Sequence, residues 1–309
     1  MKLLWLLLFL IPFTVASTVL GADTFFCPMK CEQEKIYAKP GRCPICRMKL
    51  DKVGAEGRKG MTLPEVRVDL NVLPSPKAKT PLALQLAVRQ TKDNQLVKTF
   101  EVLHEKPLHL IMVSQDLSWF DHVHPTLAPT GEFKLDYTFN EPGNYVLYAD
   151  FKPTGKNAEV IPLAFRVEGE APKPVALTED NLKTAKSVNG YDVKLTPIPS
   201  LQHGDTVKLS FYVTQNKKPV ANVEPYLGAG GHLVAVSEDT TRYLHAHPAD
   251  HVVHEAGGHG RAHHAPVATK YGPTLEFTTT FPRDGLYKVW LQFNHAGKIQ
   301  TVPFVVRAK

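Results

Sequence analysis

The stretch HLIMVSQDLSWFDHVHP, residues 109–125, decides the fold of this chain because it occurs twice. It returns without a gap as HLVAVSEDTTRYLHAHP, residues 232–248. Eight of the seventeen positions are identical, and they include three histidines in each copy. The flanks agree as well, so that the repeat covers roughly residues 65–168 and 190–309. A repeat of this length is the size of a domain and predicts two tandem domains.

Each copy consists of short segments in which apolar and polar residues alternate, separated by Gly, Pro, Asn and Asp turns. VRVDLNVL, LALQLAVR, EFKLDYTF and NYVLYADF are four such segments of the first copy. Alternation with a period of two is typical of strands, and many short strands predict an antiparallel sandwich. A polar piece at residues 178–186, between the copies, is the only one with a helical period.

Two turns strengthen this interpretation. P-G-x-Y at residues 142–145 and D-G-x-Y at residues 284–287 resemble the tyrosine corner that opens a late strand in immunoglobulin-like folds. We therefore expect a mostly β chain with two tandem immunoglobulin-like β-sandwiches. Linkers are expected near residues 54–64 and 169–189.

The repeated histidines are candidate metal ligands. Residues two apart in a strand point to the same face, so that His122 and His124 can aim both imidazoles at one ion. The preceding strand starts at His109 and can lie antiparallel to that pair, which would add a third imidazole. Three imidazoles with an open position suit zinc or copper(II). The two predicted triads are His109, His122 and His124, and His232, His245 and His247.

A structural role is the alternative, in which these histidines bond the backbone at a strand corner before a proline. A single H-x-H pair often arises by chance, whereas a triad at equal spacing in two diverged copies is harder to explain that way. The motif also resembles secreted bacterial domains with an F-x-H-x-H-P motif, which accompany copper-handling modules. Phe120, His122, His124 and Pro125 match it, and Tyr243 keeps the aromatic in the second copy. That resemblance implies metal handling.

The second copy has an insertion near residues 249–271 that the first copy lacks. It carries five histidines among Gly and Ala: His251, His254, His259, His263 and His264. Histidine-rich tracts of this kind bind divalent ions with low to moderate affinity. We expect a metal buffer or a docking arm, with a solvated loop of no function as the alternative.

All four cysteines lie in FFCPMKCEQEKIYAKPGRCPICRMKL, residues 25–50, and a methionine stands near each end of the cluster. The predicted ligands here are Cys27, Cys31, Cys43, Cys46, Met29 and Met48. Thiolates bind zinc and copper(I) strongly, and thioethers suit copper(I). Two disulfides would use the same cysteines, but the doubled proline–cysteine turns favour a metal.

This stretch is similar to the heavy-metal-binding domain that precedes copper and silver efflux adaptors and some metal-transporting ATPases. The family pattern is matched at Phe25, Cys27, Pro28, Met29, Pro40, Gly41, Cys43, Pro44, Cys46, Met48 and Leu50. Lys30 replaces the family's histidine and Cys31 follows it, so that we expect a thiolate as the fourth ligand. Arg47 replaces the family's glycine. The resemblance implies a small zinc-ribbon-like metal module at residues 23–53.

Residues 1–22 have a basic start, an apolar stretch and small residues, which predict a secretory signal peptide; an uncleaved anchor is the alternative. No later stretch is apolar and long enough to cross a bilayer, and we expect a periplasmic or secreted protein with no transmembrane segment after cleavage. The net charge of +6 is scattered, without Lys and Arg interleaved with aromatics, which argues against nucleic acid as a partner.

These features predict an exported heavy-metal-binding protein that sequesters ions or hands them on, with copper first and zinc or silver as alternatives. Its expected partners are metal ions and metal-efflux or copper-handling proteins. We expect no catalytic residue, because Asp121 beside the first triad is replaced by Leu244 beside the second, and no G-x-S-x-G or H-E-x-x-H motif occurs. The alternatives are a metal-dependent enzyme that uses the triads and an accessory subunit of a metal-efflux system.

Overall fold

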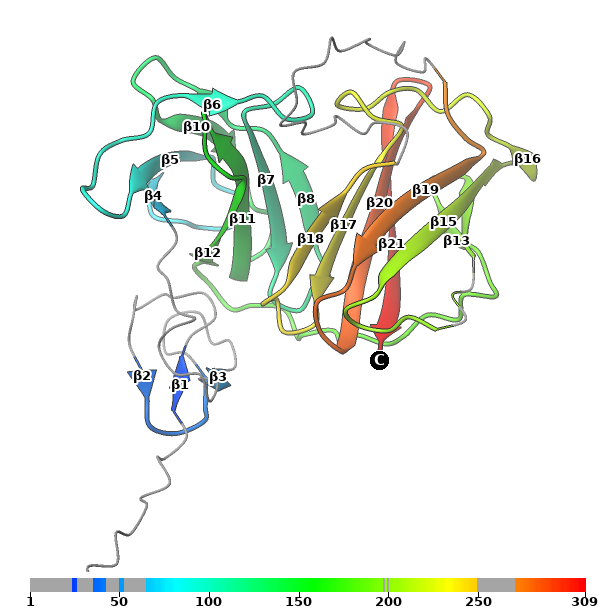
Figure 1. The fold of residues 1–309 in the computed structure, drawn as a ribbon, viewed down its shortest axis with the longest axis horizontal. Helices are drawn as coiled ribbons and strands as arrows, with labels where there is room; N and C mark the ends of the chain where they lie inside the picture. The colour runs from blue at the N-terminus through cyan, green and yellow to red at the C-terminus, as the bar shows by residue number, and fades with distance from the viewer. Residues whose placement is uncertain are drawn as a thin grey trace, which may run out of the picture.

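A computed structural model describes residues 24–26, 36–42, 50–52, 65–196, 198, 200–248 and 270–309 of the chain. Every element of these residues is a β-strand, and Figure 1 shows them gathered into a small N-terminal sheet and two larger β units. The mostly β fold with two sandwiches is therefore confirmed. The predicted signal peptide, the cysteine and methionine ligands, and residues 249–269 of the insertion lie outside the described residues.

The N-terminal module contains a three-stranded antiparallel sheet in the order β2-β1-β3. Its strands are β1 (Phe25–Phe26), β2 (Ile36–Tyr37) and β3 (Asp51–Lys52). The backbone N–H of Leu50 donates to the carbonyl of Gly41 at 2.9 Å, which ties the chain before β3 to the chain after β2.

The first sandwich has two antiparallel sheets. One has the order β4 (Val66–Leu73), β5 (Leu82–Gln90), β10 (Phe133–Tyr137), β9 (Thr126–Leu127). The other has the order β12 (Glu159–Val167), β11 (Gly143–Pro153), β7 (Leu108–Ser114), β8 (Phe120–Val123), with β6 (Phe100–Glu101) also paired to β11. Apolar side chains from both sheets fill one core between them.

The second sandwich repeats this plan. One sheet has the order β13 (Lys186–Val188), β14 (Tyr191–Leu195), β15 (Thr206–Gln215), β16 (Lys218–Pro219), with β19 (Thr274–Thr280) also paired to β15. The other has the order β18 (Tyr243–Ala246), β17 (His232–Ser237), β20 (Gly285–His295), β21 (Lys298–Ala308). Tyr271, the last residue of the predicted insertion, packs in this core and pairs with Val223.

Both predicted tyrosine corners form. The hydroxyl of Tyr145 donates to the carbonyl of Glu141 at 2.7 Å, and that of Tyr287 donates to the carbonyl of Arg283 at 3.0 Å. Each bond spans four residues and fixes the turn that leads into the long strand β11 or β20.

The two sandwiches pack against each other through a third apolar layer. Strands β7 and β17 are buried on both faces: Leu110 and Met112 of β7 point into their own core, whereas Ile111 and Val113 face the second domain. Figure 1 shows the two central sheets meeting in the middle of the molecule. Leu50 of the N-terminal module packs against the same layer and is only 4% exposed.

Aromatic pairs across this layer follow the symmetry of the repeat. Phe120 stacks on Trp290 with ring centroids 4.6 Å apart, and Tyr148 stacks on Tyr243 at 4.9 Å. Phe120 and Tyr243 occupy equivalent positions in the two copies, so that each domain gives one aromatic to each pair. The duplicated domains are thus related by an approximate two-fold axis through their interface.

The helix indicated by the sequence period at residues 178–186 does not form. This segment lies along β21, where the Asp180 carboxylate accepts the N–H of Val305 at 2.7 Å and the Asp180 N–H donates to the Val305 carbonyl at 3.0 Å. The side chain of Asn181 accepts the N–H of Lys183 at 3.1 Å and forms a turn. Short Asp and Asn side chains that bond nearby backbone compete with the helix, which explains the difference.

Candidate metal centre

The two-residue period of the strands places all six triad histidines at the domain interface. In β7, His109 shares its face with Ile111 and Val113, which pack against the second domain. In β8, His122 shares its face with Phe120, whose ring stacks on the second domain. The repeat places the second triad in the same way on β17 and β18 and on the residue that follows them.

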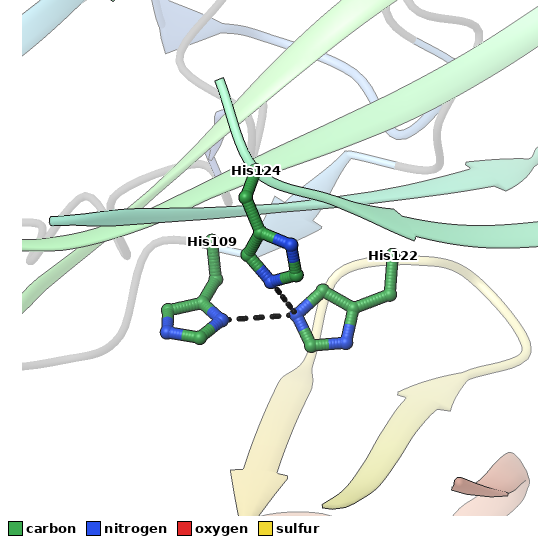
Figure 2. Close-up of side chains that lie close together, drawn as sticks. All are labelled: His109, His122 and His124. Carbon is green, nitrogen blue, oxygen red and sulfur yellow. Dashed lines mark hydrogen bonds between the residues drawn. The ribbon is translucent and has the colours of Figure 1, made fainter. Parts of the chain in front are cut away.

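The nitrogens of the first triad converge (Figure 2). His109 Nδ1 lies 3.0 Å from His122 Nε2, and His124 Nε2 lies 3.2 Å from the same atom. His109 and His122 are buried, with 3% and 6% of their surface exposed. The three imidazoles can therefore bind one ion together.

The second triad has the same arrangement. His232 Nδ1 lies 3.2 Å from His245 Nε2, and a nitrogen of His247 lies within 4.8 Å of both. His232 is completely buried. In each domain, three ligand atoms thus meet, from two neighbouring strands and the residue that follows the second of them.

Backbone carbonyls fix the tautomer of the first histidine in each triad. His109 Nε2 lies 3.0 Å from the carbonyl of Leu103, and His232 Nε2 lies 2.9 Å from the carbonyl of Tyr226. A carbonyl only accepts, so each Nε2 carries the proton and donates it. In the neutral ring the Nδ1 atom is then left with a free lone pair, and this is the atom that faces the triad.

Side chains of the opposite domain fix the tautomer of the middle histidine. His122 Nδ1 donates to Gln292 Oε1 at 2.8 Å, and the amide of Gln292 is oriented by its own donation to Thr301 at 3.1 Å. His245 Nδ1 donates to Asp150 Oδ2 at 3.1 Å, and the Tyr243 hydroxyl donates to the same oxygen at 3.0 Å. In the neutral ring, each middle histidine therefore presents an unprotonated Nε2 to its triad.

Two lone pairs consequently face each other in each triad, at 3.0 Å in the first and 3.2 Å in the second. Two acceptors at that distance repel unless a cation lies between them. Imidazole nitrogens that bind zinc at about 2.0–2.1 Å in a tetrahedron lie about 3.3 Å apart. The observed spacing, the tautomers and the outer hydrogen bonds all fit a metal-ligating imidazole.

Burial keeps the following triad imidazoles neutral: His109, His122, His124 and His232. It lowers the pKa of His109 to about 4 and the pKa of His124 to about 3, and it lowers the pKa values of His122 and His232 well below the ordinary value. Repulsion between neighbouring imidazolium ions would oppose protonation of these rings further. Neutral imidazole is the form that binds a metal ion.

Three further side chains of this centre were not predicted from the sequence. Asp150 and Gln292 hold the middle histidines, and His104 stacks its ring on His247 with centroids 3.4 Å apart. Asp150 and Gln292 occupy the same position of the repeated long strand, on the face of Tyr148 and Trp290. A polar residue at the same site of two equivalent strands, within the apolar runs VLYADF and VWLQF, was the signal that would have found them.

The other predicted ligands remain predictions. The four cysteines and two methionines of the N-terminal module lie outside the described residues, as do the five histidines of the insertion. The described strands β1, β2 and β3 frame the stretches that contain the cysteines.

Two protein-family models match the chain. One, described as a domain of unknown function (DUF8832), matches residues 61–169 and 186–309, one segment in each copy of the repeat. The other, described as a heavy metal binding domain, matches residues 24–53. The expected resemblance of the N-terminal module is thereby confirmed.

Solved structures resemble the chain only distantly. Salmonella alpha-2-macroglobulin is 17% identical with a TM-score of 0.25; the match covers 79% of this chain and 14% of that one. A two-domain fibronectin type-III segment of chicken tenascin is 10% identical with a TM-score of 0.21, covering 78% of this chain and 98% of that one. The ectodomain of mouse nectin-like molecule 4 is 10% identical with a TM-score of 0.19, covering 78% and 63%.

No curated protein matches the chain. Within the described part of the chain, no helix has the length and apolar character needed to span a membrane.

Proposed function

This chain belongs to the family described as a domain of unknown function (DUF8832), and we propose that it is an exported heavy-metal-binding protein that sequesters ions or hands them on. One observation carries the proposal for the sandwiches. In each histidine triad, two unprotonated imidazole nitrogens face each other. The other nitrogen of each of these rings donates its proton to an acceptor outside the triad. The heavy metal binding domain at residues 24–53 supports a second, separate site.

Copper is the metal we propose first, with zinc or silver as alternatives. Imidazole suits copper(II) and zinc, and copper(II) binds a given nitrogen site most tightly among the divalent ions of its row. The thiolates and thioethers of Cys27, Cys31, Cys43, Cys46, Met29 and Met48 suit copper(I). One chain would then hold both oxidation states at different sites.

Binding rather than catalysis is favoured by the carboxylates nearest the triads. Asp150 accepts hydrogen bonds from His245 and Tyr243, and Asp121 accepts from the hydroxyl of Tyr137 at 2.5 Å. Each is engaged in holding neighbouring side chains, so that neither stands ready as a general base. A metal-dependent enzyme that uses the triads is the alternative, and turnover by the metal-loaded chain would establish it.

The proposed location is the periplasm or the exterior of the cell, on the strength of the signal-like residues 1–22. There the protein would exchange ions with metal-efflux or copper-handling proteins, such as those in which heavy-metal-binding domains of this pattern occur.

Elemental analysis of the full chain tests the proposal. Purified under mild reducing conditions and dialysed, the chain should retain a metal in both the cysteine module and the sandwiches. Cys43→Ser should remove the first class and the double variant His122→Ala/His245→Ala the second, whereas His203→Ala, which alters a histidine bonded to the carbonyl of Lys309, should remove neither. Equal metal contents in all four proteins would overturn it.

A further inference from the structure

Each histidine triad depends on a hydrogen bond to the opposite domain. The middle histidine of each triad is held by the opposite domain: His122 donates to Gln292 of the second, and His245 donates to Asp150 of the first. The positions of Asp150 and Gln292 are equivalent in the repeat. Neither triad is therefore complete within its own sandwich, and both depend on the same docking of the two domains.

The rings of the two triads also lie almost as close to each other as to their own partners. Within the triads, ring centroids are 4.6–5.4 Å apart. Between the triads, His109 lies 5.4 Å from His245, and His122 lies 5.6 Å from His245 and 5.8 Å from His232. The six imidazoles form one continuous cluster.

The two halves of this cluster differ in the group that holds the middle histidine. The second triad has a carboxylate, Asp150, behind its middle histidine, and the first triad has a neutral amide, Gln292. A carboxylate that accepts the outer N–H makes an imidazole a stronger ligand and offsets part of the charge of the ion. Of the two groups that accept the outer N–H of a middle histidine, only Asp150 is a carboxylate, and it lies behind the second triad.

We infer that the two triads form one dinuclear centre for two imidazole-preferring divalent ions, such as copper(II) or zinc, and that the triad His232, His245 and His247 fills first. This inference rests on the proposed function of the triads as metal sites. The second ion binds more weakly, because it enters a buried site beside an ion of like charge and lacks a carboxylate behind its own middle histidine. Metal binding also fastens the two sandwiches together, since each site depends on both domains.

Copper(II) titration followed by electron paramagnetic resonance tests the pairing. The ion is added to the full chain after alkylation of its thiols, so that they neither bind nor reduce it. The first equivalent should give an isolated copper(II) signal. The second should reduce the signal per copper and add a half-field transition, which requires two nearby spins. Two equivalents with full, uncoupled intensity would overturn the dinuclear centre while leaving the proposed metal-binding function intact.

Variants locate the pair and test its asymmetry. His122→Ala should abolish the half-field transition and leave one isolated copper, whereas the remote control His203→Ala should keep it; a transition that survives in His122→Ala would place the pair elsewhere and refute the inference. Asp150→Asn should lower the affinity of the first ion by about 10-fold to 100-fold.

Gln292→Glu, which adds a carboxylate behind His122, provides an independent test of the same asymmetry. It should bring the affinity of the second ion toward that of the first, by about 10-fold or more. Unchanged stepwise affinities in Gln292→Glu would show that the groups behind the histidines do not set the order of filling. If the thiol-alkylated chain without any substitution bound no copper(II), the proposed function itself would be refuted.

Discussion

At the scale of single residues, His247 differs from the other triad histidines in its hydrogen bonding. Its Nε2 atom is buried and has no hydrogen-bond partner within the described ranges. Burial lowers its pKa strongly, so that the ring is neutral. A buried polar atom without a partner costs about 1–3 kcal/mol of stability. A structural histidine would not incur that cost, whereas a ligand whose lone pair is kept for an ion would.

This difference separates a metal ligand from a structural histidine. In metal-free protein, His247→Leu should leave the free energy of unfolding unchanged or raise it by about 1 kcal/mol, because it removes an unpaired buried nitrogen. The matched control is His295→Leu, which removes bonds to Tyr191 at 2.7 Å and to Asn222 at 3.1 Å. That change should lower stability by about 1–3 kcal/mol. Urea unfolding with a chelator measures both, and equal losses would indicate a structural His247.

The sequence predicted the ligands of this centre better than their surroundings. The triads could be predicted because the H-x-H spacing and the strand before it are local features repeated in two copies. The bonds from His122 to Gln292 and from His245 to Asp150 could not, because their partners lie 170 and 95 residues away along the chain. Only the docking of two domains brings them together, and no local spacing encodes that docking.

At the scale of elements, strands β7 and β17 explain why the interface was not foreseen. Strands such as β4 and β5 alternate between more buried and more exposed residues, and that pattern correctly predicted two sandwiches. The segments HLIMVS and HLVAVS do not alternate, because one face packs in the domain's own core and the other in the layer between domains. A continuous apolar run of this length indicates a strand buried on both faces. Such a run does not indicate which surface covers the second face of the strand.

The long strand β20 allows the two faces to be tested separately. Trp290 faces the layer between domains and stacks on Phe120, whereas the neighbouring Leu291 points into the core of the second sandwich. Trp290→Ala should cost about 3–5 kcal/mol and uncouple the unfolding of the two sandwiches. Leu291→Ala should cost about 2–5 kcal/mol in the second sandwich without splitting the transition. Calorimetry distinguishes them, and identical thermograms would contradict the assignment of the faces.

At the scale of the whole molecule, duplication has placed a polar cluster on an apolar interface. The layer between the sandwiches contains Ile111, Val113, Val234 and Val236, and the histidine centre continues the same strand faces. Neutral imidazoles can share a buried layer with apolar side chains, whereas imidazolium ions cannot without a large desolvation cost. The docking of the two domains therefore depends on the protonation of the histidines between them.

The stability of the metal-free protein should accordingly fall on mild acidification. Folding lowers the pKa of His109 to about 4 and that of His232 well below its ordinary value of 6.5. Between pH 6.5 and about 4 the unfolded chain binds protons that the folded chain excludes, so that stability is present above pH 6.5 and is lost as the pH falls. The slope is at most about 1.4 kcal/mol per pH unit for each such buried histidine. Unfolding titrations with a chelator from pH 7.5 to 4.5 measure it. The double variant His109→Leu/His232→Leu should flatten the slope, since leucine takes up no proton; an unchanged slope would show that acidification acts through other groups.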